Sequence, residues 1–168
     1  AVALLVAAIQ LAAVAGTSVA APVQWTIASG GNDHWYEFIY RPTGFTWEQA
    51  SAAASASSHQ GMPGYLATVT SQAENAFLYS LAKYPAGATG TVFDPANPGV
   101  SLGPIDISGR DASTWLGGSD AAAEGTWRWV NGPEIGTVFW TGTAAGSASA
   151  GAFAWWDNPS TPGGSAGI

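Results

Sequence analysis

The sequence predicts an α+β domain that combines two helices with several short strands. Two segments begin with Ser or Thr followed three residues later by Gln or Glu, a pattern that caps helix N-termini. Runs rich in Trp, Tyr, Thr and Val, separated by Gly- and Asn-rich turns, indicate strands before and after these helices. A length of 168 residues suits one domain.

The N-terminal segment is apolar and uncharged from Ala1 to Gly16. It is shorter than the roughly 20 residues that cross a membrane, and it matches the apolar region of a secretory signal. Small residues at Ser18 and Ala20 suit a signal peptidase, so we expect a cleaved signal peptide over residues 1–20. The mature chain, residues 21–168, is then a single domain. An uncleaved N-terminal anchor is the alternative.

A hairpin and a helix are the first elements expected in the mature chain. Residues 24–40 hold two aromatic and β-branched runs around a turn at residues 30–33. Thr46 and Gln49 then form a capping box, and small residues recur at helical spacing to about Ser58. A helix face of such small residues is expected to pack close to a sheet.

A second helix follows an extended link at residues 65–69. Ser71 and Glu74 form its capping box, and Pro85 ends it. Its apolar stripe at helical spacing comprises Ala73, Phe77, Leu81 and Tyr84.

Turn-forming residues dominate the remainder of the chain. Residues 86–111 are rich in Gly, Pro and Asp without a sustained period, which predicts a long surface loop inserted in the domain. Short strands are predicted at residues 114–119, 125–130 and 137–140. Residues 142–151 form a Gly/Ala/Ser stretch that predicts another loop outside the core.

The charge balance and the missing cysteine exclude several functions. The formal net charge is −7, and the four cations are scattered along the sequence: Arg41, Lys83, Arg110 and Arg128. Without a basic stripe, nucleic acid and anionic membrane surfaces are poor partners. The absence of cysteine excludes thiolate zinc sites, iron–sulfur clusters and cysteine nucleophiles.

The signals for hydrolytic chemistry are weak. Ser119 lies in a sequence that superficially resembles a nucleophile elbow, but the second glycine of that pattern is absent and the segment lies between strands. Asp120 and Glu124 are the nearest carboxylate pair for a glycosidase, in a turn where acids are usually solvated. His34 and His59 are expected to be exposed, and neither has a partner at a recognisable spacing. We therefore expect no enzyme activity.

Loop acids could instead bind calcium, which takes about six to eight oxygen ligands on a folded loop. No EF-hand pattern occurs, so the metal signal is weak. The candidates are Asp120, Glu124, Glu134, Asp157 and Asn158.

A tryptophan pair near the C-terminus is a better candidate for binding. An indole can stack on the apolar face of a sugar ring while a neighbouring acid or amide bonds its hydroxyls. The segment that combines both chemistries consists of Trp155, Trp156, Asp157 and Asn158. Most other tryptophans are expected in the core, particularly Trp47, Trp115, Trp127 and Trp129.

The order of these elements resembles the C-type lectin-like domain, especially its bacterial secreted members, over residues 35–156. Residues 66–75, Leu-Ala-Thr-Val before Ser-Gln-Ala-Glu-Asn, resemble the family's link into its second helix. Residues 115–129, with Trp-Leu-Gly-Gly and Gly-Thr-Trp-Arg-Trp, resemble its central strand and the next strand.

This resemblance implies a C-type lectin-like fold, in which two helices pack on small antiparallel sheets and a long loop region often carries a calcium-dependent sugar site. In the family, oxygen ligands flank a proline in that loop. Here Thr161 and Gly163 flank Pro162, and Gly163 has no side chain. Calcium is therefore implied by the resemblance alone. The family's last strand is also missing, so we expect the domain to be C-terminally incomplete. The family's disulfides are absent as well.

The expected function is a secreted, non-enzymatic carbohydrate-binding module for recognition or adhesion, located outside the cell, at its surface or in the periplasm. One alternative is a lectin-like scaffold that binds a protein partner through residues 86–111 and 142–151. Another is a secreted hydrolase that uses Ser119 or the pair Asp120 and Glu124.

The signal assignment predicts the N-terminus of the secreted protein. N-terminal sequencing should begin at Ala21, because signal peptidase cleaves after small residues. Recovery of a secreted chain that still carries Ala1 would contradict this assignment.

Overall fold

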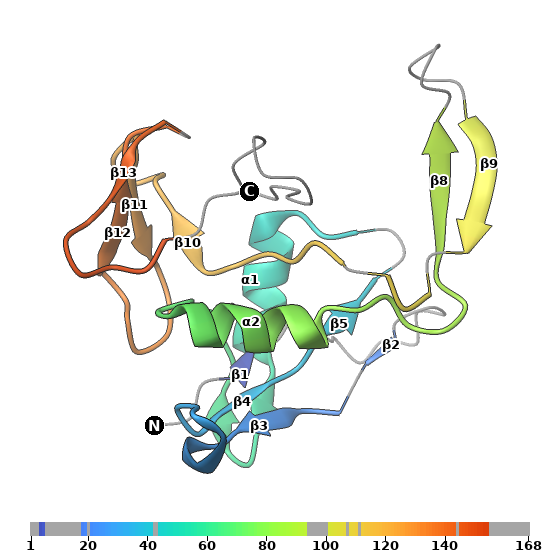
Figure 1. Ribbon diagram of the computed structural model, residues 1–168, viewed down its shortest axis with the longest axis horizontal. Coiled ribbons are helices and arrows are strands. Elements are labelled where there is room, and N and C mark those ends of the chain that lie inside the picture. Colours follow the sequence, from blue (N-terminus) through green and yellow to red (C-terminus); the bar gives the residue numbers. More distant parts are fainter. Residues whose placement is uncertain are drawn as a thin grey trace.

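A computed structural model describes residues 4–5, 18–19, 21–41, 44–93, 101–106, 108–110, 112–143 and 145–154. In this part of the chain, two α-helices combine with several small sheets whose strands are mostly antiparallel. The predicted α+β class is confirmed. Figure 1 shows a four-stranded sheet at one end of the molecule and a projecting hairpin, β8–β9, at the other.

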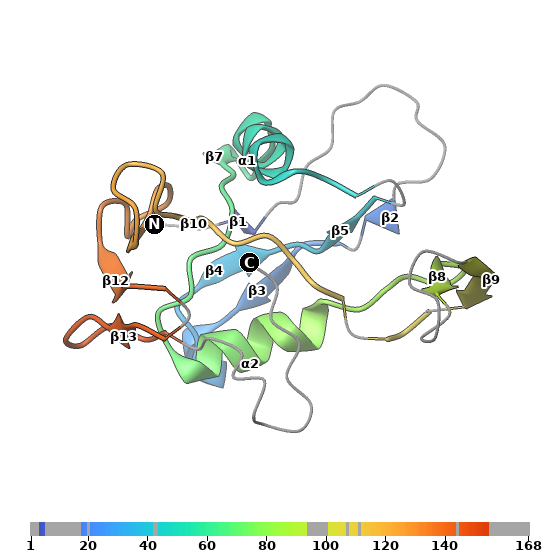
Figure 2. The same ribbon diagram turned by 90° about the horizontal axis from the view of Figure 1, so that it is seen from above.

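The predicted N-terminal hairpin is present. Strands β3 (Val23–Trp25) and β4 (His34–Tyr36) pair antiparallel, with Trp25 opposite His34. The connection contains a short 3-10 helix, Ile27–Ser29, that ends at Gly30 with a positive φ of 84°. Strand β5 (Ile39–Tyr40) continues from β4. In Figure 2, helices α1 and α2 lie on opposite sides of these strands.

Two short strands lie in the predicted signal segment. β1 (Leu4–Leu5) pairs parallel with β4, and β2 (Ser18–Val19) pairs antiparallel with β5. Cleavage after Ala20 would remove both strands from the hairpin edges.

Helix α1 (Trp47–Ala56) begins as its capping box predicts. The Thr46 hydroxyl accepts from the Gln49 amide, and the Gln49 side chain accepts from the Thr46 amide. The helix ends slightly before Ser58, because the following residues enter a small hairpin of β6 (Ser58–His59) and β7 (Met62–Pro63). Its small face is buried: Ala50 and Ala54 have no exposed surface.

Helix α2 (Gln72–Leu81) is also present, but its cap differs from the prediction. The Ser71 side chain accepts from the Glu74 amide, whereas the Glu74 carboxylate turns to Thr70 and the hairpin. The helix stops before Tyr84, whose amide donates to the Arg110 carbonyl instead. Tyr84 was predicted in the apolar stripe of this helix, but it lies beyond the helix end.

The four-stranded sheet has the order β10-β11-β12-β13. Its strands are β10 (Gly118–Ser119), β11 (Thr126–Trp129), β12 (Val138–Thr141) and β13 (Ser147–Ala148). The first three fall at the predicted strands. β13 corrects the predicted loop at residues 142–151, because its small side chains carry no hydrophobic pattern and backbone pairing with β12 defines it.

The predicted loop at residues 86–111 also needs correction, because it contains a hairpin of β8 (Thr89–Phe93) and β9 (Ser101–Asp106). Gly and Pro within its strands conceal the pattern. Pro104 lacks an amide hydrogen, and the hairpin tolerates this because no other described strand pairs with the outer edge of β8 or β9. The segment projects from the body of the domain, as expected for a surface insertion (Figure 1).

Two clusters form the core. The larger one joins the hairpin, α2 and the four-stranded sheet through Trp25, Tyr36, Leu78, Trp129 and Phe139, together with Ala67 and Val69 of the buried link. The smaller one places α1 on Ile39 and Leu66. The link at residues 65–69 thus serves both clusters.

Glu74 is a buried carboxylate, 2% exposed, between α2 and the hairpin. Its Oε1 accepts from the Tyr36 hydroxyl at 2.6 Å and from Asn32 Nδ2 at 3.0 Å. Its Oε2 accepts from the Thr70 amide at 2.8 Å and the Thr70 hydroxyl at 2.9 Å. A buried carboxylate is tolerated when such donors replace its hydration. Both oxygens of the Glu74 carboxylate therefore have hydrogen-bond donors.

No helix in the described segments has the length and apolar character needed to cross a membrane.

Replacing Glu74 with Ala should destabilise the domain by about 3 kcal/mol, because Tyr36, Asn32 and Thr70 all lose a buried acceptor. Urea denaturation followed by tryptophan fluorescence measures the loss. Glu124→Ala removes an exposed carboxylate from a turn and is the control, with an expected change below about 0.5 kcal/mol. Equal losses in both variants would contradict the role of Glu74.

Stability should fall with rising pH above about 10. Burial and the hydrogen bond to Glu74 raise the pKa of Tyr36 well above its usual value near 10. Burial and, to a smaller extent, the charge of Glu134 raise the pKa of Tyr65. In the unfolded chain these tyrosines lose protons that the folded state retains, so each lowers the unfolding free energy by up to about 1.4 kcal/mol per pH unit. Tyr36→Phe should flatten this slope. Denaturation curves between neutral pH and a pH of about 11 test it, and an unchanged slope would refute the assignment.

Candidate functional site

The residues predicted to contact a sugar lie outside the described residues. These are Trp155, Trp156, Asp157 and Asn158, and the residues around the proline of the family's loop, Thr161, Pro162 and Gly163, lie outside as well. Their roles stay predictions. The structure describes the residues that directly precede them in the chain.

The chain enters that segment from the larger core. Ala152, Phe153 and Ala154 are half-buried and pack against the same cluster as Trp127 and Trp140. The predicted binding segment therefore follows directly on residues that are packed against the larger core cluster.

Trp127 and Trp140 form a cross-strand pair in this sheet. They are directly opposite each other on β11 and β12, and both are half-buried. The Trp140 indole Nε1 donates to the Thr143 carbonyl at 2.8 Å, which orients its ring over the β12–β13 turn. Half-buried indoles that are held in place retain ring surface for an apolar ligand face.

The turn beneath Trp140 requires glycine. An added Cβ at Gly146 would overlap the Thr141 carbonyl and lie 2.8 Å from Trp140 Nε1. Gly142 has a positive φ of 103°, which other residues rarely adopt. The glycines of this segment thus allow the backbone to approach the indole, a role that composition alone did not indicate.

The sequence predicted Trp127 in the core and gave no separate role to Trp140. The spacing of the two Trp residues on strands joined by one turn could have indicated the pair, because opposed positions on paired strands become neighbours. A β-bulge between Trp127 and Arg128 shifts the register, so the pairing could not be counted from the turn alone.

The other tryptophans predicted in the core divide into three environments. Trp129 is buried and stacks on Phe139 with ring centroids 4.2 Å apart. Trp47 is half-buried and donates to the Leu116 carbonyl at 2.8 Å. Trp115 is 36% exposed, although its Nε1 donates to the Phe45 carbonyl, so its core assignment was wrong.

Asp120 and Glu124 share one turn before β11. Asp120 is half-buried, and its Oδ2 accepts from the Gly125 amide at 3.1 Å, which closes the turn. Glu124 is exposed. The Asp120 carboxylate therefore has a structural role in the turn, and Glu124 is the more accessible acid.

Glu134 lies in a different turn, after β11, and its environment is more enclosed. Its Oε2 accepts from the buried Thr68 hydroxyl at 2.7 Å. Nearby, the Tyr65 hydroxyl and the Asn131 amide are buried without a hydrogen-bond partner among the described residues. Neither Tyr65 nor Asn131 was predicted as a site residue, because the link and the turn meet only in the folded chain.

Among the described residues, the metal candidates Asp120, Glu124 and Glu134 do not form a group that could hold an ion; the first two precede β11 and the third follows it. In the described part of the chain, no three His, Cys, Asp or Glu residues lie close enough to hold a metal ion.

Ser119 and the histidines lie in separate settings. Ser119 pairs with Arg128 between β10 and β11, and its hydroxyl accepts from the Ala121 amide at 3.2 Å. The expected exposure of the histidines was wrong. His34 is half-buried in β4, where burial lowers its pKa, and His59 is half-buried against Trp35 with ring centroids 4.6 Å apart.

Comparison with known proteins gives a relative in Haloquadratum walsbyi (strain DSM 16790 / HBSQ001), a protein named Halomucin. The two are 35% identical over 141 residues, which cover 80% of this chain. The chain spans about 1% of the length of that relative. No family model matches the chain, and no solved structure matches it.

Gly132 holds the turn that positions Asn131 and Glu134, and its replacement by Ala should be costly. Its φ is +73°, and an added Cβ would lie 2.5 Å from the Tyr65 ring. Gly132→Ala should therefore lower the unfolding free energy by about 2–4 kcal/mol through strain and overlap.

Gly136→Ala is the matched control for this prediction. Gly136 has a φ of +86° but no atom within 4 Å of an added Cβ, so only the backbone cost of about 1 kcal/mol applies. Thermal denaturation of both variants measures the difference. Equal losses would show that the Tyr65 contact does not constrain the turn.

Proposed function

We propose that this domain is a secreted, non-enzymatic carbohydrate-binding module with a C-type lectin-like fold. The observation that carries the proposal is the packing of Phe153 and Ala154 on the core cluster that also holds Trp127 and Trp140. The predicted segment of Trp155 and Trp156 follows directly on these residues, and the four-stranded sheet adds the oriented indole pair of Trp127 and Trp140. Partly exposed indoles suit the apolar faces of sugars.

The arrangement of elements supports the lectin-like part of the proposal. A hairpin, two capped helices joined by a buried link, a long insertion and a small antiparallel sheet follow one another in the order of the resemblance. Fold resemblance alone does not define a ligand, because one fold can host many functions. The aromatic surface is therefore the basis for proposing a carbohydrate ligand.

Calcium belongs to the proposal only as an ion bound by loop oxygens. Among the described candidates, Glu124 is exposed and Asp120 is bonded to the Gly125 amide, so together they offer few oxygens for an ion that takes about six to eight. Asp157 and Asn158 would have to supply further ligands. A chelator is the direct test.

An extracellular location is supported by two features. The N-terminal segment has the composition of a secretory signal. A relative named Halomucin adds to this, because the name denotes a mucin, a class of extracellular protein.

The projecting β8–β9 hairpin favours a second candidate function, a scaffold that binds a protein partner. The hairpin extends from the body of the domain, and both strands have edges that lack a partner among the described strands (Figure 1). Such edges can pair with an extended segment of another chain. The hydrolase alternative has less support, because no hydrogen bond joins Ser119 to a histidine in the described residues.

Glycan-array binding with the secreted chain tests the carbohydrate proposal. We expect binding to at least one glycan class, and the double variant Trp155→Ala/Trp156→Ala should weaken it at least about tenfold, a change of about 1.4 kcal/mol, because stacked indoles contribute strongly to binding. Parallel arrays with calcium and with a chelator show whether the ion takes part.

Trp115→Phe is the matched control, since it changes a partly exposed tryptophan that is not part of the Trp127–Trp140 pair. Its glycan binding should equal that of the unchanged chain. The proposal fails if no glycan binds in either buffer, or if the double variant binds as well as the control. Glycan cleavage that is lost in Ser119→Ala or Glu124→Gln would favour the hydrolase.

A further inference from the structure

Several buried polar atoms meet where the link at residues 65–69 contacts the turn at residues 131–134. The Tyr65 hydroxyl and both polar atoms of the Asn131 amide are buried and have no hydrogen-bond partner among the described residues. Tyr65 is only 9% exposed. Native proteins pair almost all atoms of this kind, so a group of unpaired ones indicates a ligand such as an ion. We call this place the Tyr65–Asn131 junction.

Two glycines allow the link and the turn to approach each other at the junction. The Tyr65 ring lies 2.5 Å from the position that a Cβ on Gly132 would take, and Gly132 follows Asn131 in the chain. The Asn131 Oδ1 lies against Gly117 in the same way, and the Leu66 carbonyl oxygen is 2.8 Å from a Cβ added at Gly117. One oxygen of the turn and one of the link therefore face the space that a side chain at Gly117 would fill.

Glu134 adds a carboxylate to the junction. It is half-buried, and its Oε2 accepts from the Thr68 hydroxyl at 2.7 Å, its one hydrogen bond within the described part of the chain. The Glu74 carboxylate, by contrast, accepts from four donors. Burial and, to a smaller extent, the charge of Glu134 raise the pKa of Tyr65, so this carboxylate acts electrostatically on the unpaired hydroxyl. Glu134 thus retains free lone pairs at the junction.

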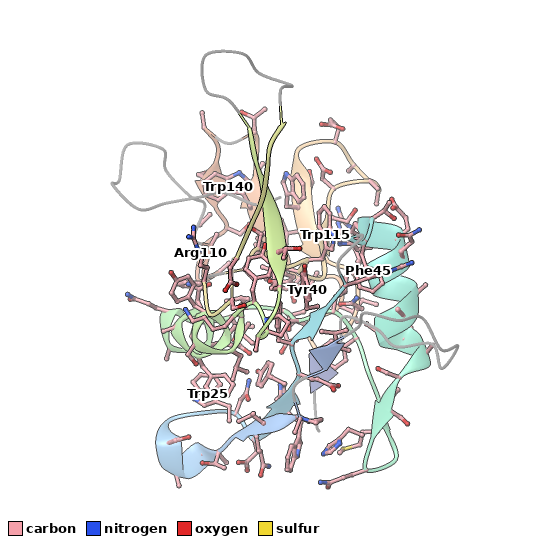
Figure 3. All side chains as sticks on the ribbon, turned by 90° about the vertical axis from the view of Figure 1, so that its right-hand side faces the viewer. Trp25, Tyr40, Phe45, Arg110, Trp115 and Trp140 are labelled. Atoms are coloured by element: carbon pink, nitrogen blue, oxygen red, sulfur yellow. The ribbon has the colours of Figure 1, made fainter. Side chains whose placement is uncertain are left out.

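No lysine or arginine forms an ion pair with Glu134 in the described segments. Lys83 and Arg41 lie over aromatic rings instead. Figure 3 shows Arg110 on the α2 side of the domain, whereas Trp115, which leads into the strand beside the junction, lies on the α1 side. The Glu134 charge is therefore not neutralised by a bonded cation of the chain.

His34 and Arg128 do not change this balance. Burial lowers the pKa of His34 more than the charges of Glu134 and Glu74 raise it, so the imidazole is neutral near neutral pH. Arg128 lies on β11, where its Nε is buried without a partner among the described residues. The junction thus combines one uncompensated carboxylate with unpaired oxygens, which is the chemistry of a cation site.

We propose that the Tyr65–Asn131 junction binds a calcium ion. Its protein ligands are the Glu134 carboxylate, the Asn131 amide oxygen and the Leu66 carbonyl oxygen. Calcium takes about six to eight oxygens, among them carboxylate, amide and backbone carbonyl oxygens and waters. Waters on the ion accept from the Asn131 amide nitrogen and the Tyr65 hydroxyl, so the remaining unpaired atoms find partners. Magnesium fits less well, because it requires near-ideal octahedral geometry.

This site is independent of the proposed carbohydrate binding. It uses one carboxylate with neutral oxygens, so it does not require three acids or histidines in one place, a group that the described residues lack. It also does not involve Asp157 or Asn158, the loop residues considered for a sugar-linked ion. A single charged ligand predicts weak binding, with a Kd of about 10⁻⁴ to 10⁻³ M, as in extracellular modules.

Urea denaturation of the full chain in calcium and in chelator tests the proposal. About 10 mM calcium should raise the folding equilibrium constant about 10- to 100-fold above its value in chelator with sodium chloride of equal ionic strength. Glu134→Gln keeps an acceptor for Thr68 but loses the charge, so its gain in calcium should fall below about twofold. Asn131→Asp adds a charged ligand, so it should be less stable than the unchanged chain in chelator and gain more from calcium.

Glu124→Gln is the matched control, because it removes the same charge from an exposed residue of another turn. Glu124→Gln and Asp157→Asn should keep the calcium response, magnesium should stabilise less than calcium, and circular dichroism confirms that each variant is folded. The proposal is overturned if calcium adds no stability beyond the matched salt, or if Glu134→Gln responds like the unchanged chain. It is also overturned if Glu124→Gln or Asp157→Asn abolishes the response, because the ion then lies at the loop acids.

Discussion

The buried Glu74 carboxylate is the interaction on which the arrangement of this domain depends. Its two oxygens take four donors from Tyr36, Asn32 and Thr70, which belong to the hairpin and to the link before α2. A carboxylate without such donors would carry a large desolvation cost, so the helix and hairpin are stable together only in the geometry that supplies them. Rings pack around this centre, with Phe77 against both Trp25 and Tyr36.

This central packing places two different surfaces in different parts of the molecule. The sheet β10–β13 carries the cross-strand pair of Trp127 and Trp140, and Phe153 and Ala154 pack against the larger core cluster just before Trp155. The outer part of α2 and residues 112–116 line an apolar groove. An aromatic surface suits the apolar faces of sugars.

Glycine has a specific structural role at the turns that support the first surface. Gly146 lets the backbone approach the Trp140 indole, and Gly132 lets the turn with Asn131 and Glu134 lie against the Tyr65 ring. The chain has 22 glycines and no cysteine, so these turns are held by close packing and hydrogen bonds instead of disulfides. Their rigidity depends on neighbours that are distant in sequence.

The sequence by itself determined the starts of both helices, the N-terminal hairpin and the general positions of β10, β11 and β12, because caps, turns and strand periodicity are local properties. Only the tertiary structure decided that Glu74 bonds the hairpin instead of completing its capping box, and that residues 89–106 contain a hairpin. It also decided that Trp127 lies opposite Trp140. These outcomes depend on contacts between residues far apart in the chain, whose energies no local pattern records.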